Sequence, residues 1–316
     1  MIPHGHTAET SQGSPAAPAD RGRADWYWPD VSEATFERYN RLLGQHVVVA
    51  GSMRWRRIRP FFFAPLLPFD VRATATIQAP PSSWCGGLQY AVPAAEPPNS
   101  CIRLSMFREL ASYSLSQLDY NRRRQIRIAA QKIEIRPVDD LDTLIREGHR
   151  VYCDFYERTR YSYGVQRRDP VFFRRWAEAV LDLPGLVILG GYVRDGLRGV
   201  SISMRVGEVL IYATYFCDTE SLRMGISDLM LHAVRAAAAS SGDAQAIYVG
   251  SFKGRKDDFY ALRGAQCVKL PARLQLNPLA RAALKALRPQ VYAKLLGDFP
   301  EHAWADVEEG RCFGQT

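Results

Sequence analysis

The chain has 316 residues, of which 47% are hydrophobic and 11% aromatic, so it is long enough for two domains or one large α/β unit with a substantial core. Its formal net charge of +8 is carried mostly by arginine, which suits RNA, phosphorylated cofactors or anionic membranes as partners, and a generic basic surface is an equal alternative. The six cysteines form no C-x-x-C pair, which argues against a cysteine zinc site and a disulfide framework, so a cytoplasmic setting is expected. No apolar run reaches the length of a membrane span, which argues against a transmembrane protein.

The N-terminal part begins with a segment of low complexity. Residues 1–24 are rich in Ser, Ala, Pro and Gly without periodicity, which predicts a disordered tail. Order is expected from residue 25, with a helix that ends at Gly44 and a strand at 45–50. The extended segment 53–63 alternates arginine with aromatic and aliphatic residues. This alternation can bind nucleic acid, but it is more typical of a half-buried strand with a solvated basic face.

A helix predicted over 110–131 carries the densest positive charge of the chain. A run of charge on a helix is usually a solvated face, and binding of RNA or another phosphate is the alternative. A strand is predicted next, over 132–138. The arginines concerned are Arg122, Arg123, Arg124 and Arg127.

Three consecutive strands follow two more helices in the second half of the chain. Asp195-Gly196 between the first two strands is a hairpin signal, so the strands should be antiparallel neighbours. Strict alternation in the third strand puts Tyr212 and Thr214 on one face and Tyr215 on the other. The predicted helices cover 139–161 and 170–181, and the predicted strands cover 187–193, 199–206 and 209–216.

A polar loop leads from the third strand into an Ala-rich helix that ends at Gly242. Ser227 and Asp228 are good N-cap candidates for this helix. A helix N-terminus presents unpaired N–H groups and the positive end of the helix dipole. Because Arg223 and Gly225 precede it, the loop is a candidate site for an anion such as a pyrophosphate or a carboxylate. An ordinary capped helix is the alternative.

The C-terminal part contains fewer signals. A strand is predicted at 245–249 and a last helix at 255–263. Residues 267–276 are expected to form an edge strand, because Pro271 interrupts them. A basic amphipathic helix opens the C-terminal extension, 277–316. We expect it to cap the second half of the molecule rather than to bind RNA.

The order of these elements resembles the GNAT acyltransferase fold. It is more similar to the FemAB-type aminoacyltransferases and their acyl-CoA-using relatives, which pair two GNAT-like lobes. The resemblance implies an α/β (α+β) fold with a mixed sheet flanked by helices, and two lobes at 25–138 and 139–276. The residues that carry it, in family order, are Arg122–Arg127, Thr159-Arg160, Gly199, Tyr212, Ser227-Asp228-Leu229, Gly242, Gly250-Ser251, Phe259 and Gly264.

Two positions depart from the family pattern. The cofactor loop at 223–227 is one residue shorter between the arginine and the first glycine, which weakens the case for acyl-CoA. FemAB-type proteins carry Phe-Lys in the last helix, whereas this chain has Tyr260 at the position of the lysine. The nearest cations are Lys253, Lys256 and Arg263.

The resemblance implies an enzyme that forms an amide from an activated ester or thioester. Tyr212 and Tyr260 are candidates for proton transfer or for assisting the leaving group, Asp218 is a candidate base, and Lys253 is a candidate to neutralise developing negative charge. Backbone N–H groups of 213–215 are the implied oxyanion donors. The residues expected to bind the donor or its anionic part are Arg160, Arg223, Gly225, Ser227, Ser251 and Lys256.

The predicted function is transfer of an aminoacyl or acyl group to an amine of a small molecule or peptide. Aminoacyl-tRNA is the favoured co-substrate, since the surface is rich in arginine and the cofactor loop is atypical. Acyl-CoA is one alternative, and a non-catalytic RNA-binding or scaffold protein is another. No tightly bound cofactor or metal is expected, because the histidines are scattered and no nucleotide-binding or zinc motif occurs. Cys217 could be a nucleophile, but an inert packed side chain is favoured.

Overall fold

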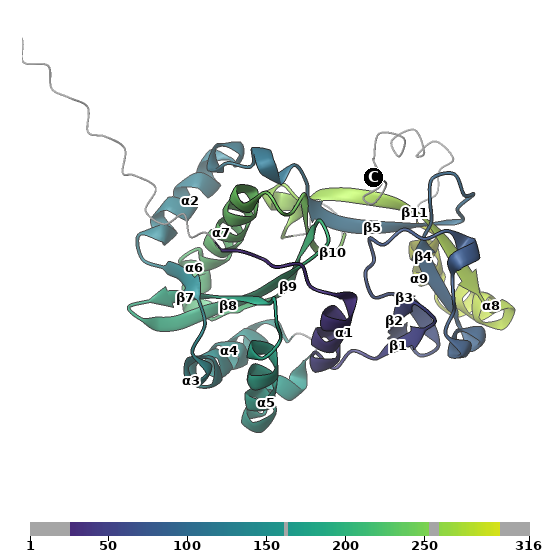
Figure 1. Cartoon of the computed structure of the whole chain (residues 1–316), viewed down its shortest axis with the longest axis horizontal. Helices are drawn as coiled ribbons and strands as arrows, with labels where there is room; N and C mark the ends of the chain where they lie inside the picture. Colours follow the sequence, from purple (N-terminus) through teal and green to yellow (C-terminus); the bar gives the residue numbers. More distant parts are fainter. Residues whose placement is uncertain (1–25, 161–163, 253–258, 298–316) are drawn as a thin grey trace, which may run out of the picture.

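The computed structural model describes residues 26–160, 164–252 and 259–297. These residues form one eleven-stranded sheet in the order β1-β2-β3-β4-β11-β5-β10-β9-β8-β7-β6, with helices on both faces (Figure 1). The predicted class, a mixed α/β fold, is confirmed. The strands are β1 (Val47–Ala50), β2 (Met53–Arg59), β3 (Phe62–Pro65), β4 (Gly87–Ala91), β5 (Ser100–Phe107), β6 (Glu134–Pro137), β7 (Val187–Val193), β8 (Gly196–Val206), β9 (Val209–Cys217), β10 (Ala246–Ser251) and β11 (Gln266–Leu276).

The helices are divided between the two faces of the sheet. Figure 1 shows α2, α6 and α7 on one side of β7–β9, and α3, α4 and α5 on the other. The α-helices are α1 (Glu33–Leu42), α2 (Tyr120–Ala130), α3 (Leu141–Thr143), α4 (His149–Thr159), α5 (Pro170–Leu181), α6 (Thr219–Arg223), α7 (Ile226–Ser241), α8 (Pro278–Leu287) and α9 (Pro289–Leu296). Shorter helical turns are η1 (Thr74–Thr76), η2 (Pro81–Cys85), η3 (Leu110–Ser112), η4 (Leu115–Gln117), η5 (Leu144–Gly148), η6 (Val165–Arg168) and η7 (Ala261–Arg263).

Each face of the central strands has its own hydrophobic core. On one face, Val200, Ile202 and Phe216 pack with side chains of α1, α4 and α5. On the other face, Leu210 and Tyr212 pack with α7 and with the N-terminal segment. Strands covered on both faces are expected to be apolar, and β7 follows this rule, whereas β8 alternates apolar side chains with serine and arginine. The central strands are therefore buried on both faces, and they support the candidate site.

The sheet runs through both of the lobes predicted from the sequence. β6, from the first predicted lobe, pairs antiparallel with β7 of the second. The N-terminal segment also reaches the second half, because Val31 donates its backbone N–H to Arg205 O at 2.9 Å. The division into two lobes at residue 138 therefore stays a prediction. The hydrogen-bonded sheet continues across that boundary.

The expected edge strand is in the interior of the sheet. β11 pairs with β4 on one side and with β5 on the other. Pro271 lacks an N–H group, but it still lies opposite Cys101, and its carbonyl accepts the N–H of Val92 at 2.9 Å. The prediction was wrong because a proline can occupy an interior strand where its missing donor is not needed.

Two predicted helices are shorter than expected. Only α2 is helical in the predicted helix 110–131, after the 3₁₀ turns η3 and η4. Asp119 sets its start, because its carboxylate accepts the N–H of Arg122 at 2.9 Å. Of the last predicted helix, residues 255–258 lie outside the described part, and its end is the single 3₁₀ turn η7.

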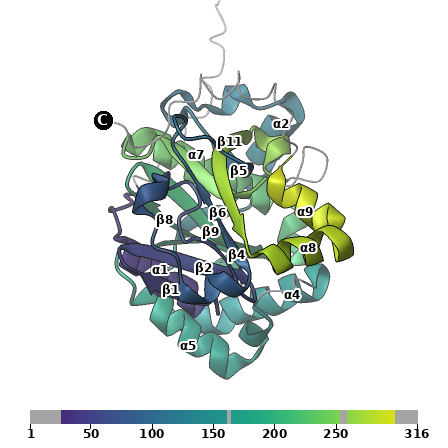
Figure 2. The same ribbon diagram turned by 90° about the vertical axis from the view of Figure 1, so that its right-hand side faces the viewer.

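The sequence suggested that the helix after β11 caps the second half of the molecule. The structure instead places α9 against strands of the first half. Leu295 O of α9 accepts hydrogen bonds from Gln89 of β4 and Ser100 of β5, at 3.0 and 2.6 Å. The reason is topological: β11 lies between β4 and β5, so the chain that leaves it packs beside those strands. Figure 2 shows α8 and α9 together on that side of the molecule.

Candidate active site at the end of strand β9

Strand β9 carries a bulge at Ala213. Its pairing with β8 places Tyr212 opposite Ser203 and Thr214 opposite Ile202, so Ala213 is the extra residue. The bulge brings Tyr212 and Tyr215 to the same face, where their rings stack with centroids 6.1 Å apart. Strict alternation, which separated these two tyrosines, was wrong here because a bulge leaves no mark in the hydrophobic pattern.

The other side of the bulge faces α1. Thr214 Oγ1 lies 2.6 Å from the hydroxyl of Tyr39, a fully buried residue of α1. Burial raises the pKa of Tyr39 to about 12, so this phenol stays neutral. Tyr39 was not singled out from the sequence, and it fixes the bulge from the face opposite the stacked tyrosines.

Strands β9 and β10 are paired only at their beginnings. Their parallel pairing covers Val209–Ile211 and Ala246–Tyr248, whereas β9 continues to Cys217. Among the described residues, the edge of 212–217 that faces away from β8 therefore has no strand partner. Backbone N–H groups on such an edge are free to bind an oxygen that carries negative charge. The implied oxyanion donors, 213–215, lie in this segment.

Three tyrosines surround this edge. The ring of Tyr260 meets Tyr212 edge-on, with centroids 6.3 Å apart. The hydroxyls of Tyr215 and Ser227 lie 2.8 Å apart. Burial raises the pKa of both Tyr212 and Tyr215 well above the usual value of 10. Neutral phenols at physiological pH can donate hydrogen bonds or a proton, but they cannot act as bases.

Asp218 immediately follows β9 and is buried among hydrogen-bond donors. It caps α6, since Oδ1 accepts from Ser221 N at 2.8 Å and from Ser221 Oγ at 2.6 Å. Its other oxygen accepts from Arg198 at 3.2 Å and lies 3.7 Å from Arg150. Burial raises the pKa of Asp218, but the bonds from Ser221 and Arg198 outweigh it and lower the pKa overall. A carboxylate with a lowered pKa is a weak base.

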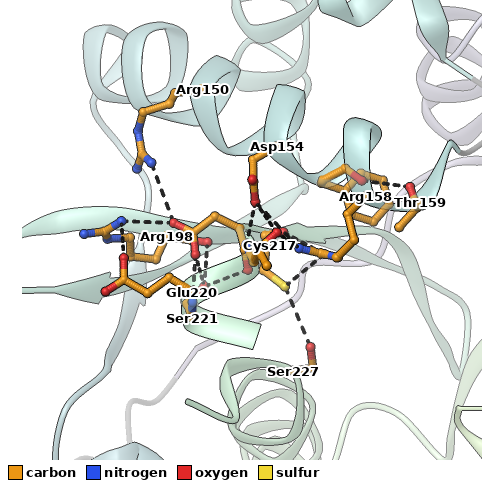
Figure 3. Close-up of polar contacts among 12 residues, drawn as sticks. Arg150, Asp154, Arg158, Thr159, Arg198, Cys217, Glu220, Ser221 and Ser227 are labelled. Carbon is orange, nitrogen blue, oxygen red and sulfur yellow. Dashed lines mark hydrogen bonds and ion pairs between the residues drawn. The ribbon is translucent and has the colours of Figure 1, made fainter. Parts of the chain in front are cut away.

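A second group of charges ties α4 to the end of β9. Asp154 Oδ2 accepts from the hydroxyl of Thr219 at 2.9 Å, and Arg158 donates to Cys217 O at 3.0 Å. Figure 3 shows the two groups side by side, with Arg150, Arg198 and Glu220 at one end and Asp154 and Arg158 at the other. No local pattern in the sequence marks these pairs, because their partners are about 60 residues apart.

Asp228 connects three elements through its buried carboxylate. Arg263 of η7 binds it with two bonds, Nε to Oδ1 at 2.6 Å and Nη2 to Oδ2 at 2.9 Å. Arg122 of α2 donates to Oδ1 at 3.0 Å. Ser227 and Asp228 are therefore not N-caps. The N-cap is Gly225, whose φ of +89° suits glycine. Ser227 and Asp228 lie in the first turn of α7, and their side chains bind partners on other elements.

The predicted donor-binding residues do not form one cluster. Ser227 is buried against Tyr215, and Gly225 caps α7. The remaining described candidates lie exposed at the ends of separate elements: Arg160 after α4, Arg223 in α6 and Ser251 in β10. Lys253 and Lys256 lie outside the described residues. The donor-binding roles stay predictions.

The four arginines of α2 differ in their environments. Arg122 is engaged with Asp228, and Arg123 donates to Ser116 O at 3.1 Å. Arg124 and Arg127 are exposed. Elsewhere in the described part of the chain, no three His, Cys, Asp or Glu side chains are grouped as metal ligands. Among those same residues, no helix has both the length and the apolarity required to cross a membrane.

The bulged third strand, the parting of β9 from β10 and the helix between them define a GNAT-type fold. Solved structures support this class. The C-terminal domain of a protein assigned as lysylphosphatidylglycerol synthetase from Agrobacterium fabrum matches with a TM-score of 0.53 and 11% identity, over 81% of this chain and 91% of that one. FemX matches with a TM-score of 0.51 and 8% identity, over 82% and 95%.

A third structure of the same type is L-PGS from Bacillus licheniformis. Its TM-score is 0.50 at 8% identity, over 85% of this chain and 98% of that one. No protein-family model and no curated protein matches the sequence. At these identities the similarity concerns the fold, and the chain has the fold of the FemAB-like GNAT-type proteins. The resemblance inferred from the order of elements is confirmed at that level.

Proposed function

We propose that this protein is an acyltransferase that moves an aminoacyl or acyl group from an activated donor to an amine and forms an amide. One observation carries the proposal: the bulged, unpaired edge of β9 lies beside neutral tyrosines. Acyl transfer needs a site for the oxyanion and a path for one proton. The edge of β9 supplies the first, and the phenols of Tyr212 and Tyr260 supply the second.

The reaction balances without a strongly basic side chain. The amine nitrogen attacks the carbonyl carbon of the donor, and backbone N–H groups of 213–215 bind the oxyanion that forms. When the bond to the leaving oxygen or sulfur breaks, that atom takes a proton from a phenol. The phenol recovers its proton from the new ammonium nitrogen, which becomes the amide. Asp218 is not needed in this scheme, since its lowered pKa makes it a weak base.

Aminoacyl-tRNA is the proposed donor. Gln125 of α2 packs against the N-terminus of α7, where a GNAT-type protein would bind a pyrophosphate, because a Cβ at Gly225 would lie 3.1 Å from Gln125 Cγ. This contact disfavours the pyrophosphate of acyl-CoA at this position. The exposed Arg124 and Arg127 on α2 suit the backbone of RNA.

The donor test supplies the full-length protein with two panels of substrates. One panel is tRNA charged with isotope-labelled amino acids, and the other is acyl-CoA, each offered with a mixture of amines. Mass spectrometry of the products should show labelled amides from the tRNA panel. Saturable binding of CoA with no response to tRNA would reassign the donor. RNA binding without turnover of any donor would instead support the non-catalytic alternative.

The role of α2 is tested by salt dependence. Arg124→Ala with Arg127→Ala should weaken tRNA binding and lower the slope of log affinity against log salt by about 1.5, because two phosphate contacts are lost. The matched control replaces Arg174 and Arg175, which are exposed on α5, and should leave the slope unchanged. An equal change in both double variants would mean that the binding is general attraction to a basic surface.

A further inference from the structure

Helix α8 exposes its apolar side to solvent. Leu279, Ala283 and Leu287 repeat every four residues, so they share one side of the helix. Leu279 is 81% exposed and Leu287 is 76% exposed, and no residue of α8 is buried. The apolar stripe of a surface helix normally faces the core, so this arrangement indicates a partner that the described residues do not supply.

Basic residues occupy another side of the same helix. Arg281, Lys285 and Arg288 follow one another at intervals of four and three and are all exposed. The sequence contains no aspartate or glutamate between residues 259 and 297. The exposed face of α8 is therefore apolar along one side and positively charged along the other, without acidic residues to neutralise it.

An exposed tryptophan lies next to the start of α8. Asn277, the N-cap of α8, donates its side-chain N–H to Trp84 O at 2.9 Å, and the Trp84 side chain is 81% exposed. We define the α8 face by Trp84, Leu279 and Leu287 together with Arg281 and Lys285. An exposed tryptophan, exposed leucines and adjacent cations are the composition of helices that lie in the interface of a lipid bilayer.

We propose that the α8 face docks the protein on an anionic membrane surface. Its apolar side chains would enter the boundary between headgroups and acyl chains, while its cations pair with acidic headgroups. A second copy of the chain fits less well, because two uniformly basic faces would repel each other. RNA fits less well too, since exposed leucines and alanines gain nothing from phosphates. This inference is independent of the proposed acyl transfer.

The test measures binding of the full-length protein to vesicles of phosphatidylcholine with and without phosphatidylglycerol. Wild-type protein should float with the anionic vesicles and much less with the neutral ones. Arg281→Glu with Lys285→Glu should weaken binding by at least about 25-fold, because each cation near an anionic surface is worth about fivefold and each glutamate adds repulsion. Leu279→Glu with Leu287→Glu should weaken it about tenfold or more, because both side chains lose their apolar environment.

Matched controls lie on α5, at the bottom of Figure 1, whereas α8 lies at the right. Val171, which is 57% exposed, and Arg174 and Arg175 provide the same types of residue there. Val171→Glu and Arg174→Glu with Arg175→Glu should leave vesicle binding unchanged, and circular dichroism should show that all variants are folded. Vesicles should also shift the tryptophan emission to the blue, and Trp84→Phe should remove most of that shift.

Three results would overturn the proposal. The first is absence of binding to anionic vesicles at low salt, and the second is an equal loss in the α5 controls. The third is a different partner for the same face. If the partner is a second copy of the chain, sedimentation should show a dimer that Leu279→Glu dissociates. If the partner is RNA, a tRNA titration should show binding that requires Arg281 and Lys285, and the protein should not bind vesicles.

Discussion

Two groups of polar side chains border the end of β9, and one consists of ion-paired charges whereas the other consists of phenols. Asp218 and Asp154, with their arginine partners, form ion pairs and helix-capping bonds that hold α4, α6 and β8 together. Tyr212 and Tyr260 contact each other through their rings, and burial raises the pKa of Tyr212 well above its usual value. Asp218, Tyr212 and Tyr260 are catalytic candidates from the sequence, whereas Asp154 is not singled out there.

This difference indicates which of the two groups we propose for proton transfer. The oxygens of Asp218 already accept bonds from Ser221 and Arg198, so its charge stabilises the fold. Burial raises the pKa of Tyr212 well above its usual value, and Tyr212 belongs to the part of β9 that has no strand partner among the described residues. We therefore propose that the charges stabilise the fold and that the phenols transfer the proton. Four variants, or pairs of variants, test this division.

The largest expected effect concerns Asp228, whose buried carboxylate pairs with two arginines. Asp228→Ala leaves Arg122 and Arg263 without their shared partner, and breaking a buried ion pair costs about 3 kcal/mol or more. Urea unfolding should show this loss. Asp243→Ala, at an exposed position after the same helix, should change the free energy of unfolding by less than about 0.5 kcal/mol. Similar values for both variants would show that the buried pairs are not structural.

The next effect concerns the neutral group. Tyr260→Phe removes the hydroxyl but keeps the ring that packs on Tyr212 and Phe107. The rate of amide formation should fall about 100-fold, which is typical for the loss of a general acid, while stability changes by less than about 1 kcal/mol. Tyr120→Phe, at an exposed position of α2, should leave both unchanged. Unchanged turnover in both Tyr260→Phe and Tyr212→Phe would remove the phenols from the mechanism.

The roles of Asp228 and Tyr260 could be predicted from the sequence to different degrees. The order of strands and helices was readable, because hydrophobic periodicity and turn residues mark each element. Tyr212 and Tyr260 were found through the family resemblance. Asp228 was interpreted as an N-cap, since a sequence shows that a carboxylate starts a helix but not that two distant arginines bind it.

The bulge and the short β9–β10 pairing are beyond what periodicity can predict. A bulge inserts one residue without changing composition, so regular alternation was predicted for the third strand across Ala213. The length of a parallel pairing depends on where the partner strand turns away, which no local signal encodes. Both features are long-range results of packing, and both determine which backbone N–H groups are exposed to a substrate.

A third prediction separates structure from chemistry at Asp218 itself. Asp218→Asn should destabilise the protein by about 2 kcal/mol at neutral pH, because charged hydrogen bonds are replaced by neutral ones. The pKa of Asp218 is lowered from its ordinary value of 3.8, so this stabilisation is present above pH 4 and is lost as the pH falls through the lowered pKa. The difference in unfolding free energy between wild type and variant should therefore shrink in acid.

Turnover of the same variant gives the decisive comparison. If Asp218 only supports the fold, Asp218→Asn should lower the rate less than about tenfold at a temperature where both proteins are folded. A loss of more than about 100-fold with unchanged stability would identify Asp218 as the base after all, since that is the size of a general-base effect.

The smallest effect tests whether all the tyrosines of the bulge belong to one group. Tyr215 differs from Tyr212 because its hydroxyl lies 2.8 Å from that of Ser227, which is buried in α7. Ser227→Ala should cost about 1 kcal/mol of stability, and Tyr215→Phe should cost a similar amount. In the double variant the two losses should not add, because each removes the same bond.

The matched control for this pair lies later on the same helix. Ser240 is exposed, and its hydroxyl donates to Ala236 O within α7, at 2.9 Å. Ser240→Ala should therefore change the free energy of unfolding by less than about 0.5 kcal/mol, and its effect should add to that of Tyr215→Phe. Additive losses for Ser227→Ala and Tyr215→Phe would mean that Ser227 does not hold Tyr215. The phenol of Tyr215 would then join those of Tyr212 and Tyr260 as a candidate proton donor.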